Sequence, residues 1–162
     1  MPSERIWIGP NFPRSGIFVL GESWYGEYTD DLVTDDGWIR AYLDRQVPDR
    51  MYTRMANACG MTRHQFWESV MFTNFVQCVG TLRENRRSAV MYAAAQSRLM
   101  ALLESHRPRG VWVLGMGQAD YSVPVIERAG IVAEVTPHPT SYGLSNAALG
   151  QSWKRLNERI AA

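Results

Sequence analysis

Three polar side chains of different chemistry occur at or just beyond short apolar runs in this sequence. They are the carboxylate of Glu22, the carboxamide of Asn74 and the imidazole of His138. A carboxylate can position water or stabilise positive charge on a sugar, and a carboxamide carries a donor and an acceptor in one plane. A histidine can donate to an oxygen that gains negative charge as a bond breaks. The set suits hydrolysis of an N-glycosidic bond, in which a planar base leaves as an anion.

Each of these residues also has an ordinary structural explanation. Gly21–Gly26 is compatible with a simple strand-to-helix turn that leaves Glu22 in solvent, and Asn74 can satisfy backbone groups at a strand end. His138, between two prolines, can be a turn residue, and the aromatic residues after Glu22 can belong to the core. Because all three polar residues occur at strand ends, the pattern favours the functional interpretation of the set.

Four apolar runs alternate with segments of helical periodicity along the chain. These runs lack polar alternation, which predicts strands that are buried on both faces. They are Ile17–Leu20, Val70–Val76, Val111–Leu114 and Ile131–Val135. Strands alternating with helices predict a single α/β domain over residues 1–162, with three α/β/α layers and a four-stranded, mainly parallel sheet. Residues 1–15 are expected to be an irregular lead-in, in which Ile6–Ile8 is a candidate edge strand.

The helical segments complete the predicted arrangement. Helices are expected after Asp36, around Met55, after a capping box at Thr62 and Gln65, over Ser88–His106 and Gln118–Ala129, and from Ser145 to Ile160. Parallel strands present their carboxyl ends along one edge of the sheet, where ligands of such sheets bind. We therefore expect the three polar residues and Gly115 to face one cleft.

The composition narrows the functional classes. The chain has 162 residues, of which 46% are hydrophobic, and its 17 basic and 16 acidic side chains leave a net charge of +1. Bulk positive charge is therefore excluded as a means of binding nucleic acid, and any such contact must come from a local patch. Two cysteines are too few for a disulfide framework, and Ile6–Ile8 is too short for a signal peptide or a membrane span. We expect a soluble, intracellular, cytoplasmic protein.

Several common catalytic signatures are missing from the sequence. There is no P-loop sequence, Gly115–Gln118 lacks the third glycine of a dinucleotide fingerprint, and Gly21–Tyr25 lacks the closing glycine of a nucleophile elbow. The three histidines, His64, His106 and His138, are too scattered to indicate a metal site. The expectation is a protein with no metal and no cofactor.

Four stretches, in this order along the chain, resemble the motifs of the uracil-DNA glycosylase superfamily. They are Gly21–Glu27, Phe72–Cys78, Val113–Ala119 and Thr136–Tyr142. The resemblance extends over about residues 16–160, and its Thr-Asn and His-Pro motifs are short singly but fairly specific together. It implies that Glu22 activates water, that Asn74 recognises the base and that His138 stabilises the departing base oxygen.

The same resemblance implies a base pocket around the first motif. Ser23 and Trp24 would border the base, and Tyr25 resembles the tyrosine with which one branch of the superfamily excludes thymine. Trp24 stands where the family has proline, which changes the pocket that the family pattern implies. The residue that stacks on the base cannot be assigned by counting, so Trp24 and then Trp38 are the preferred candidates, with Tyr28 as another.

Two further segments are expected to contact DNA. The resemblance implies that the loop after His138 probes the minor groove and fills the space left by an extruded nucleotide, through Thr140, Ser141, Tyr142 and Leu144. A polar loop can supply phosphate contacts through Arg83, Arg86 and Arg87. A solvated arginine loop is an equally good interpretation of the second segment.

The resemblance does not extend to a metal cluster. Cys78 matches one ligand position of the iron–sulfur branch, but no Cys-x-x-Cys precedes the first strand and Cys59 falls in a predicted helix. We therefore predict no cluster.

The implied function is that of a monomeric DNA glycosylase, which hydrolyses the N-glycosidic bond of uracil or a related deaminated base flipped out of DNA. One alternative is an inactive member that binds nucleic acid or a base, or serves as an interaction module, and Trp24 favours it. Another alternative is a small α/β hydrolase of free nucleosides or nucleotides.

Overall fold

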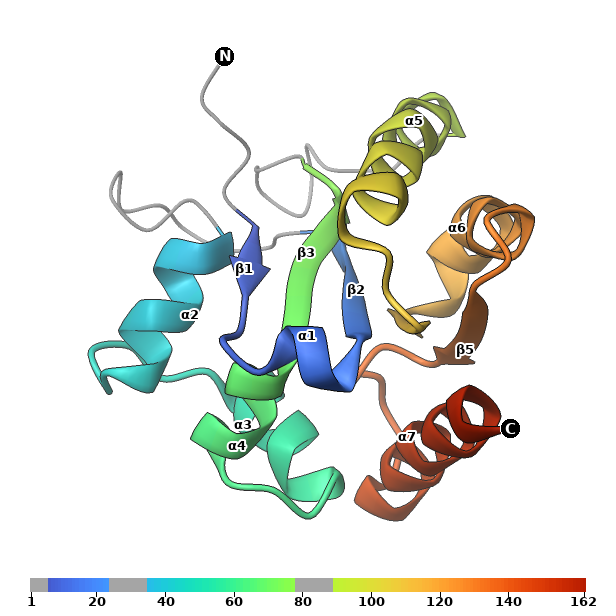
Figure 1. Ribbon diagram of the computed structural model, residues 1–162. Coiled ribbons are helices and arrows are strands. Elements are labelled where there is room, and N and C mark those ends of the chain that lie inside the picture. The colour runs from blue at the N-terminus through green and yellow to red at the C-terminus, as the bar shows by residue number, and fades with distance from the viewer. Residues whose placement is uncertain (1–5, 24–34, 78–88) are drawn as a thin grey trace.

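The computed structural model describes residues 6–23, 35–77 and 89–162, which form a five-stranded sheet between layers of helices (Figure 1). The strands are β1 (Trp7–Ile8), β2 (Ile17–Ser23), β3 (Val70–Val76), β4 (Gly110–Leu114) and β5 (Val132–Thr136). Their spatial order is β1-β3-β2-β4-β5, in which β1 is antiparallel to β3 and every other pair is parallel. The three-layer α/β/α class with a mainly parallel sheet is confirmed.

The number of strands differs from the prediction, because the sheet has five rather than four. The additional strand is the candidate edge strand, where Trp7 and Ile8 pair with Phe72 and Met71. The lead-in that the sequence predicts to be irregular also contains a short helix, which ends where Gly16 takes up a left-handed conformation with φ of 68°. A residue without a β-carbon adopts that conformation without steric cost.

Seven helices are present in the described part of the chain. They are α1 (Phe12–Ser15), α2 (Asp35–Leu43), α3 (Arg50–Ala58), α4 (Arg63–Ser69), α5 (Ala89–His106), α6 (Met116–Arg128) and α7 (Asn146–Ala161). The predicted caps of α4 and α7 are confirmed: Thr62 and Gln65 form the capping box, and Ser145 accepts the backbone N–H of Ala148. None of the helices in residues 6–23, 35–77 and 89–162 combines the length and apolar character that a membrane crossing needs.

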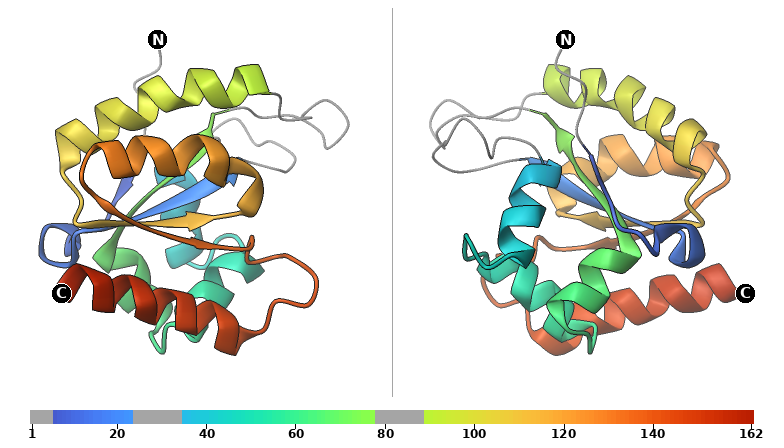
Figure 2. Two further views of the ribbon diagram at one scale, coloured as in Figure 1. Left: turned by 90° about the vertical axis from the view of Figure 1, so that its right-hand side faces the viewer. Right: turned by 60° about the vertical axis from the view of Figure 1, so that its left-hand side comes forward.

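Different helices cover the two faces of the sheet (Figure 2). The helices α5 and α6 lie on one face, and α2, α3, α4 and α7 lie on the other. Along β2 the side chains alternate between these layers, with Phe18 and Leu20 facing α5 and α6 and with Ile17 and Val19 facing the opposite way. Both faces are buried, which explains why the strands appear in the sequence as continuous apolar runs.

Aromatic side chains dominate the core beneath α3, α4 and α7. The rings of Tyr52 and Trp67 lie 4.3 Å apart between centroids, and those of Phe66 and Trp153 lie 5.4 Å apart. Phe66 and Trp67 are completely buried. Each buried ring of this size contributes about 2–3 kcal/mol relative to an exposed one, so this cluster holds three helices to the sheet.

The strand order creates a reversal at the middle of the sheet. From β2 the chain crosses to β3 on one side, and then returns past β2 to β4 on the other side. In parallel sheets, ligands bind beyond the carboxyl ends of the strands at such a reversal. Glu22 lies near the carboxyl end of β2, where β2 and β4 are neighbours.

Candidate functional site

The carboxylate of Glu22 lies against the beginning of α6. Its Oε1 accepts a 2.8 Å hydrogen bond from the hydroxyl of Tyr92 on α5. A β-carbon added to Gly117 would lie 2.8 Å from Oε1, and one added to Gly115 would lie 3.1 Å from Oε2. Two glycines therefore make room for the carboxylate at the amino end of a helix, where the helix dipole favours negative charge.

Tyr92 is held in place by two neighbouring rings. It stacks on Phe75 with centroids 5.9 Å apart, and on Tyr121 with centroids 4.7 Å apart. The side chain is 8% exposed. Its hydroxyl therefore has a defined position beside Glu22. Sequence reasoning gave this residue no role and predicted only a helix over Ser88–His106.

Asn74 lies opposite Gly21 in the register of β3 and β2 and is buried. Its Nδ2 donates a 2.9 Å hydrogen bond to Oδ1 of Asp35, and its backbone N–H donates a 3.2 Å bond to Oδ2 of the same carboxylate. A β-carbon on Gly21 would come within 2.3 Å of Oδ1 of Asn74, so only glycine leaves space for this amide. The orientation of the amide is therefore determined by its neighbours.

Asp35 is the buried centre of this arrangement, and sequence reasoning missed it in favour of Asp36 as a helix cap. Besides Asn74, the hydroxyl of Thr73 donates to Oδ2 of Asp35 at 2.6 Å. Burial raises the pKa of the Asp35 carboxyl, although the hydrogen bonds and the charge of Arg98 act in the opposite direction. Arg98 also donates to the carbonyl of Asn74 at 3.1 Å and to the Thr73 hydroxyl at 2.9 Å. The amide of Asn74 thus sits in a network that spans α2, β3 and α5.

His138 follows β5 and is half-buried. Its Nδ1 lies 2.7 Å from the hydroxyl of Thr140 and accepts the backbone N–H of Thr140 at 3.3 Å. A backbone N–H can only donate, so this contact corresponds to the neutral tautomer with its proton on Nε2. This tautomer can donate through Nε2, which is the chemistry expected of His138.

Arg54 on α3 holds both ends of the loop that contains His138. Its guanidinium donates to the backbone carbonyls of Pro139 and Leu144, and its Nε donates to Oδ1 of Asn146 at 2.7 Å. No sequence motif pointed to Arg54, because its partners lie at least 85 residues away along the chain.

The carboxyl ends of the strands bring the expected residues to one edge. Asn74 is next to Gly21, the residue before Glu22, while the Glu22 carboxylate lies at Gly115. The N–H of Gly115 donates to the carbonyl of Thr136 at 2.8 Å, two residues before His138. Backbone contacts thus run along this edge from β3 to β5. The Glu22 side chain contacts α5 and α6, whereas the Asn74 side chain contacts α2 in the other layer. A common cleft for the three side chains therefore stays a prediction.

The remaining expected residues occupy varied positions. Ser23 is buried at the end of β2, and Trp38 packs partly buried on the core and donates through Nε1 to Asp49 at 2.9 Å. In the loop, Tyr142 is fully exposed while Leu144 packs against the core. Ser141 donates its backbone N–H to the carbonyl of His138 at 2.7 Å, and Thr140 is exposed. Expected residues that lie outside the described segments are Trp24, Tyr25, Tyr28, Cys78, Arg83, Arg86 and Arg87.

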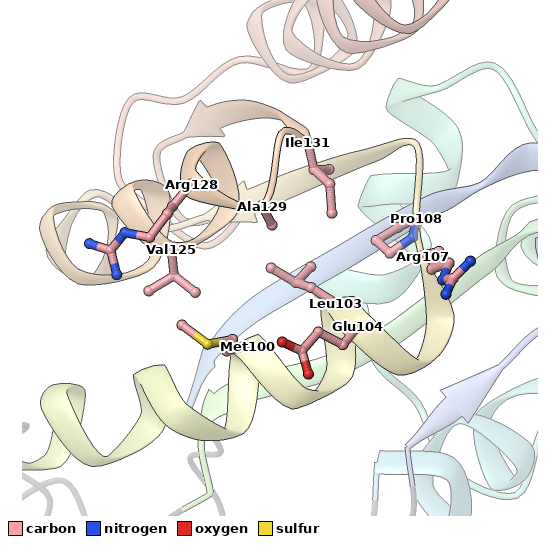
Figure 3. Close-up of a pocket in the computed structure, with 9 residues that line it drawn as sticks. All are labelled: Met100, Leu103, Glu104, Arg107, Pro108, Val125, Arg128, Ala129 and Ile131. Carbon is pink, nitrogen blue, oxygen red and sulfur yellow. The ribbon is translucent and has the colours of Figure 1, made fainter.

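On the α5 side of the sheet, described residues line two hollows. One, of about 290 Å³, borders the end of β3 and is lined by Phe75, Gln77 and Arg98 among others. The other, of about 440 Å³, lies between the carboxyl ends of α5 and α6 (Figure 3). Its lining residues include Leu103 and Val125, and it opens near the amino ends of β4 and β5. The second hollow is therefore at the opposite end of the sheet from Glu22.

No protein-family model matches the chain, and no curated protein matches it. Within residues 6–23, 35–77 and 89–162, no group of three or more His, Cys, Asp or Glu side chains is placed to hold a metal ion.

Proposed function

We propose that this chain is a DNA glycosylase that hydrolyses the N-glycosidic bond of uracil, or of a related deaminated base, flipped out of DNA. The observation that supports it is the common edge formed by the strand ends. Along this edge, Glu22, Asn74 and His138 each form a hydrogen bond with a specific side chain. These partners are Tyr92, Asp35 and Thr140. The resemblance of four sequence motifs to the uracil-DNA glycosylases supplies the substrate class.

The three side chains divide the reaction between them. As the bond between the sugar carbon and the base nitrogen breaks, its electron pair leaves with the base, and the sugar becomes cation-like. Glu22 positions the water that adds to the sugar carbon and takes the proton that this water loses, and its negative charge stabilises the developing cation. His138 donates through Nε2 to the base oxygen that gains negative charge. Asn74 offers its amide to the edge of the base.

A strand-cleavage assay tests this proposal. The protein is incubated with single- and double-stranded DNA that contains uracil, hypoxanthine or mismatched thymine, and alkali then cleaves at any abasic site. We expect strand breaks with the wild-type protein and far fewer strand breaks with Glu22→Gln. The matched control is Glu127→Gln, because Glu127 is an exposed carboxylate near the other end of α6. The proposal fails if no base is released, or if Glu22→Gln releases base as fast as the control.

Two outcomes would select the alternatives. Trp24 in place of the family's proline favours a protein that binds without cutting, and salt-dependent binding of uracil-containing DNA without base release would identify it. Release of base from a free nucleoside, but not from an oligonucleotide, would identify a nucleoside hydrolase.

A further inference from the structure

A pocket lined mostly by polar and charged residues lies on the face of the sheet opposite α5 and α6. It has a volume of about 460 Å³ and is formed by one side of α3, the beginnings of α4 and α7, and the end of α2. Its lining includes three arginines and four uncharged polar residues, which are Arg50, Arg54, Arg63, Tyr42, Thr53, Asn57 and Asn146. The pocket adjoins the His138 loop, because Arg54 and Asn146 both contribute to it and bond to each other.

Two of the three arginines of this pocket, Arg54 and Arg63, are oriented by neutral groups. Arg54 donates to two backbone carbonyls and an asparagine, while Arg63 donates to the carbonyl of Tyr42 at 3.1 Å and lies 4.6 Å from the centre of its ring. Among the described residues, none of the three guanidinium groups forms an ion pair with a carboxylate. The pocket therefore keeps three positive charges.

Asp49 is the acidic residue among those that line the pocket, and its oxygens are already occupied. Its Oδ1 accepts the backbone N–H of Tyr52 at 3.0 Å, and its Oδ2 accepts the indole N–H of Trp38 at 2.9 Å. These bonds direct the carboxylate to the beginning of α3, where it caps the helix. Asp49 therefore offsets one charge and leaves the pocket with net positive charge.

The ligand that suits this lining is a phosphate group. A phosphate has several oxygens that accept from donors in different directions, and guanidinium groups bind it with paired N–H bonds. The amino ends of α3 and α7 beside the pocket add favourable dipoles. We propose that this pocket binds a phosphate of the DNA backbone next to the flipped nucleotide. That the phosphate belongs to DNA depends on the proposed function, whereas the chemistry of the pocket does not.

The first test measures binding to a duplex that contains no uracil, so that no turnover occurs. Fluorescence anisotropy gives the Kd over a range of salt concentrations for wild type, Arg50→Gln and Arg63→Gln. Each variant is expected to weaken binding roughly 3- to 10-fold and to lower the slope of log Kd against log salt by about 0.9, the value for one lost phosphate contact. Arg50 is exposed, so its replacement leaves the fold intact.

Arg128→Gln is the matched control for this charge change. Arg128 is exposed and lies beside the groove at the other end of the sheet (Figure 3). Its replacement is expected to leave the Kd and the salt slope as in wild type. If Arg50→Gln and Arg63→Gln behave like Arg128→Gln while the duplex binds, the pocket does not contact DNA phosphate and the inference is overturned.

A second measurement separates this inference from the proposed function. Inorganic phosphate is titrated into the wild-type protein, and the Nε–H resonances of the arginines are followed by NMR against an equal ionic strength of chloride. Saturable shifts of Arg54 and Arg63, absent for Arg128 and reduced in Arg50→Gln, support a phosphate site even if the duplex does not bind. In that case the proposal that DNA is the substrate is wrong, and the proposal that the pocket binds phosphate is supported. Shifts that match those in chloride overturn the site itself.

Discussion

The hydroxyl of Tyr92 donates a 2.8 Å hydrogen bond to Oε1 of Glu22, although 70 residues separate the two in the chain. Replacing Tyr92 by Phe keeps the ring stack on Phe75 and removes this bond. Because a hydrogen bond to a charged acceptor contributes about 1.5–3 kcal/mol, kcat for base release should fall by about 10- to 100-fold with little change in KM. Single-turnover kinetics on uracil-containing DNA measure this loss.

The matched control for Tyr92→Phe is Tyr121→Phe, which removes the hydroxyl of the next ring in the stack. Tyr121 keeps its stacking in that variant, and kcat should remain as in wild type. Equal rates for the two variants would show that the bond to Glu22 has no role in the reaction.

The glycine at position 117 is expected to be essential for activity but not for folding. A β-carbon there would meet Oε1 of Glu22 at 2.8 Å, so Gly117→Ala should displace the carboxylate. A displacement of this kind costs about 10- to 100-fold in rate. Alanine is the better helix former by up to about 1 kcal/mol, so the Tm should not fall by much. A variant with wild-type kcat would contradict the placement of Glu22 as the water-positioning group.

Asp35 should make the stability of the protein depend on pH. Burial raises its pKa above the usual 3.8, so the folded state holds this proton more tightly than the unfolded chain does. The stability that Asp35 contributes is therefore complete below pH 3.8 and is lost as the pH rises through the folded-state pKa. Asp35→Asn removes this titration. Urea unfolding from about pH 3 to pH 7 measures the free energy of unfolding of both proteins. We expect the value for Asp35→Asn to increase relative to that of the wild type as the pH rises. A relative free energy of unfolding that stays constant, or that changes in the opposite direction, would show that the pKa of Asp35 is not raised by folding.

The tautomer of His138 can be tested directly. Because Nδ1 accepts the N–H of Thr140, ¹⁵N NMR of the neutral ring should show an unprotonated Nδ1 and a protonated Nε2. Thr140→Val removes the hydroxyl partner at 2.7 Å and should slow base release by about 2- to 10-fold, whereas Thr140→Ser keeps the hydroxyl and the rate. A proton on Nδ1 would exclude donation by Nε2 from the neutral ring.

Some features of the fold follow from local patterns and were predictable for that reason. The runs at β2, β3 and β4 are mainly apolar because both faces of the sheet are covered there, whereas the edge strand β5 includes Glu134 and is partly exposed. The strands and their common edge are visible in the sequence for that reason. Helix caps are equally local, because Thr62 and Gln65 bond to each other's backbone within one turn.

The sequence by itself determined the strand ends and therefore the shared edge at which Glu22, Asn74 and His138 lie. Only the tertiary structure decided which groups hold them. Asp35 reaches Asn74 over 39 residues, and Arg54 reaches Leu144 over 90. A hydrogen bond depends on distance and direction between atoms, and for residues so far apart these are set by how helices pack on the sheet. Periodicity and spacing along the chain carry no information about that packing, which is why the supporting residues became visible only in three dimensions.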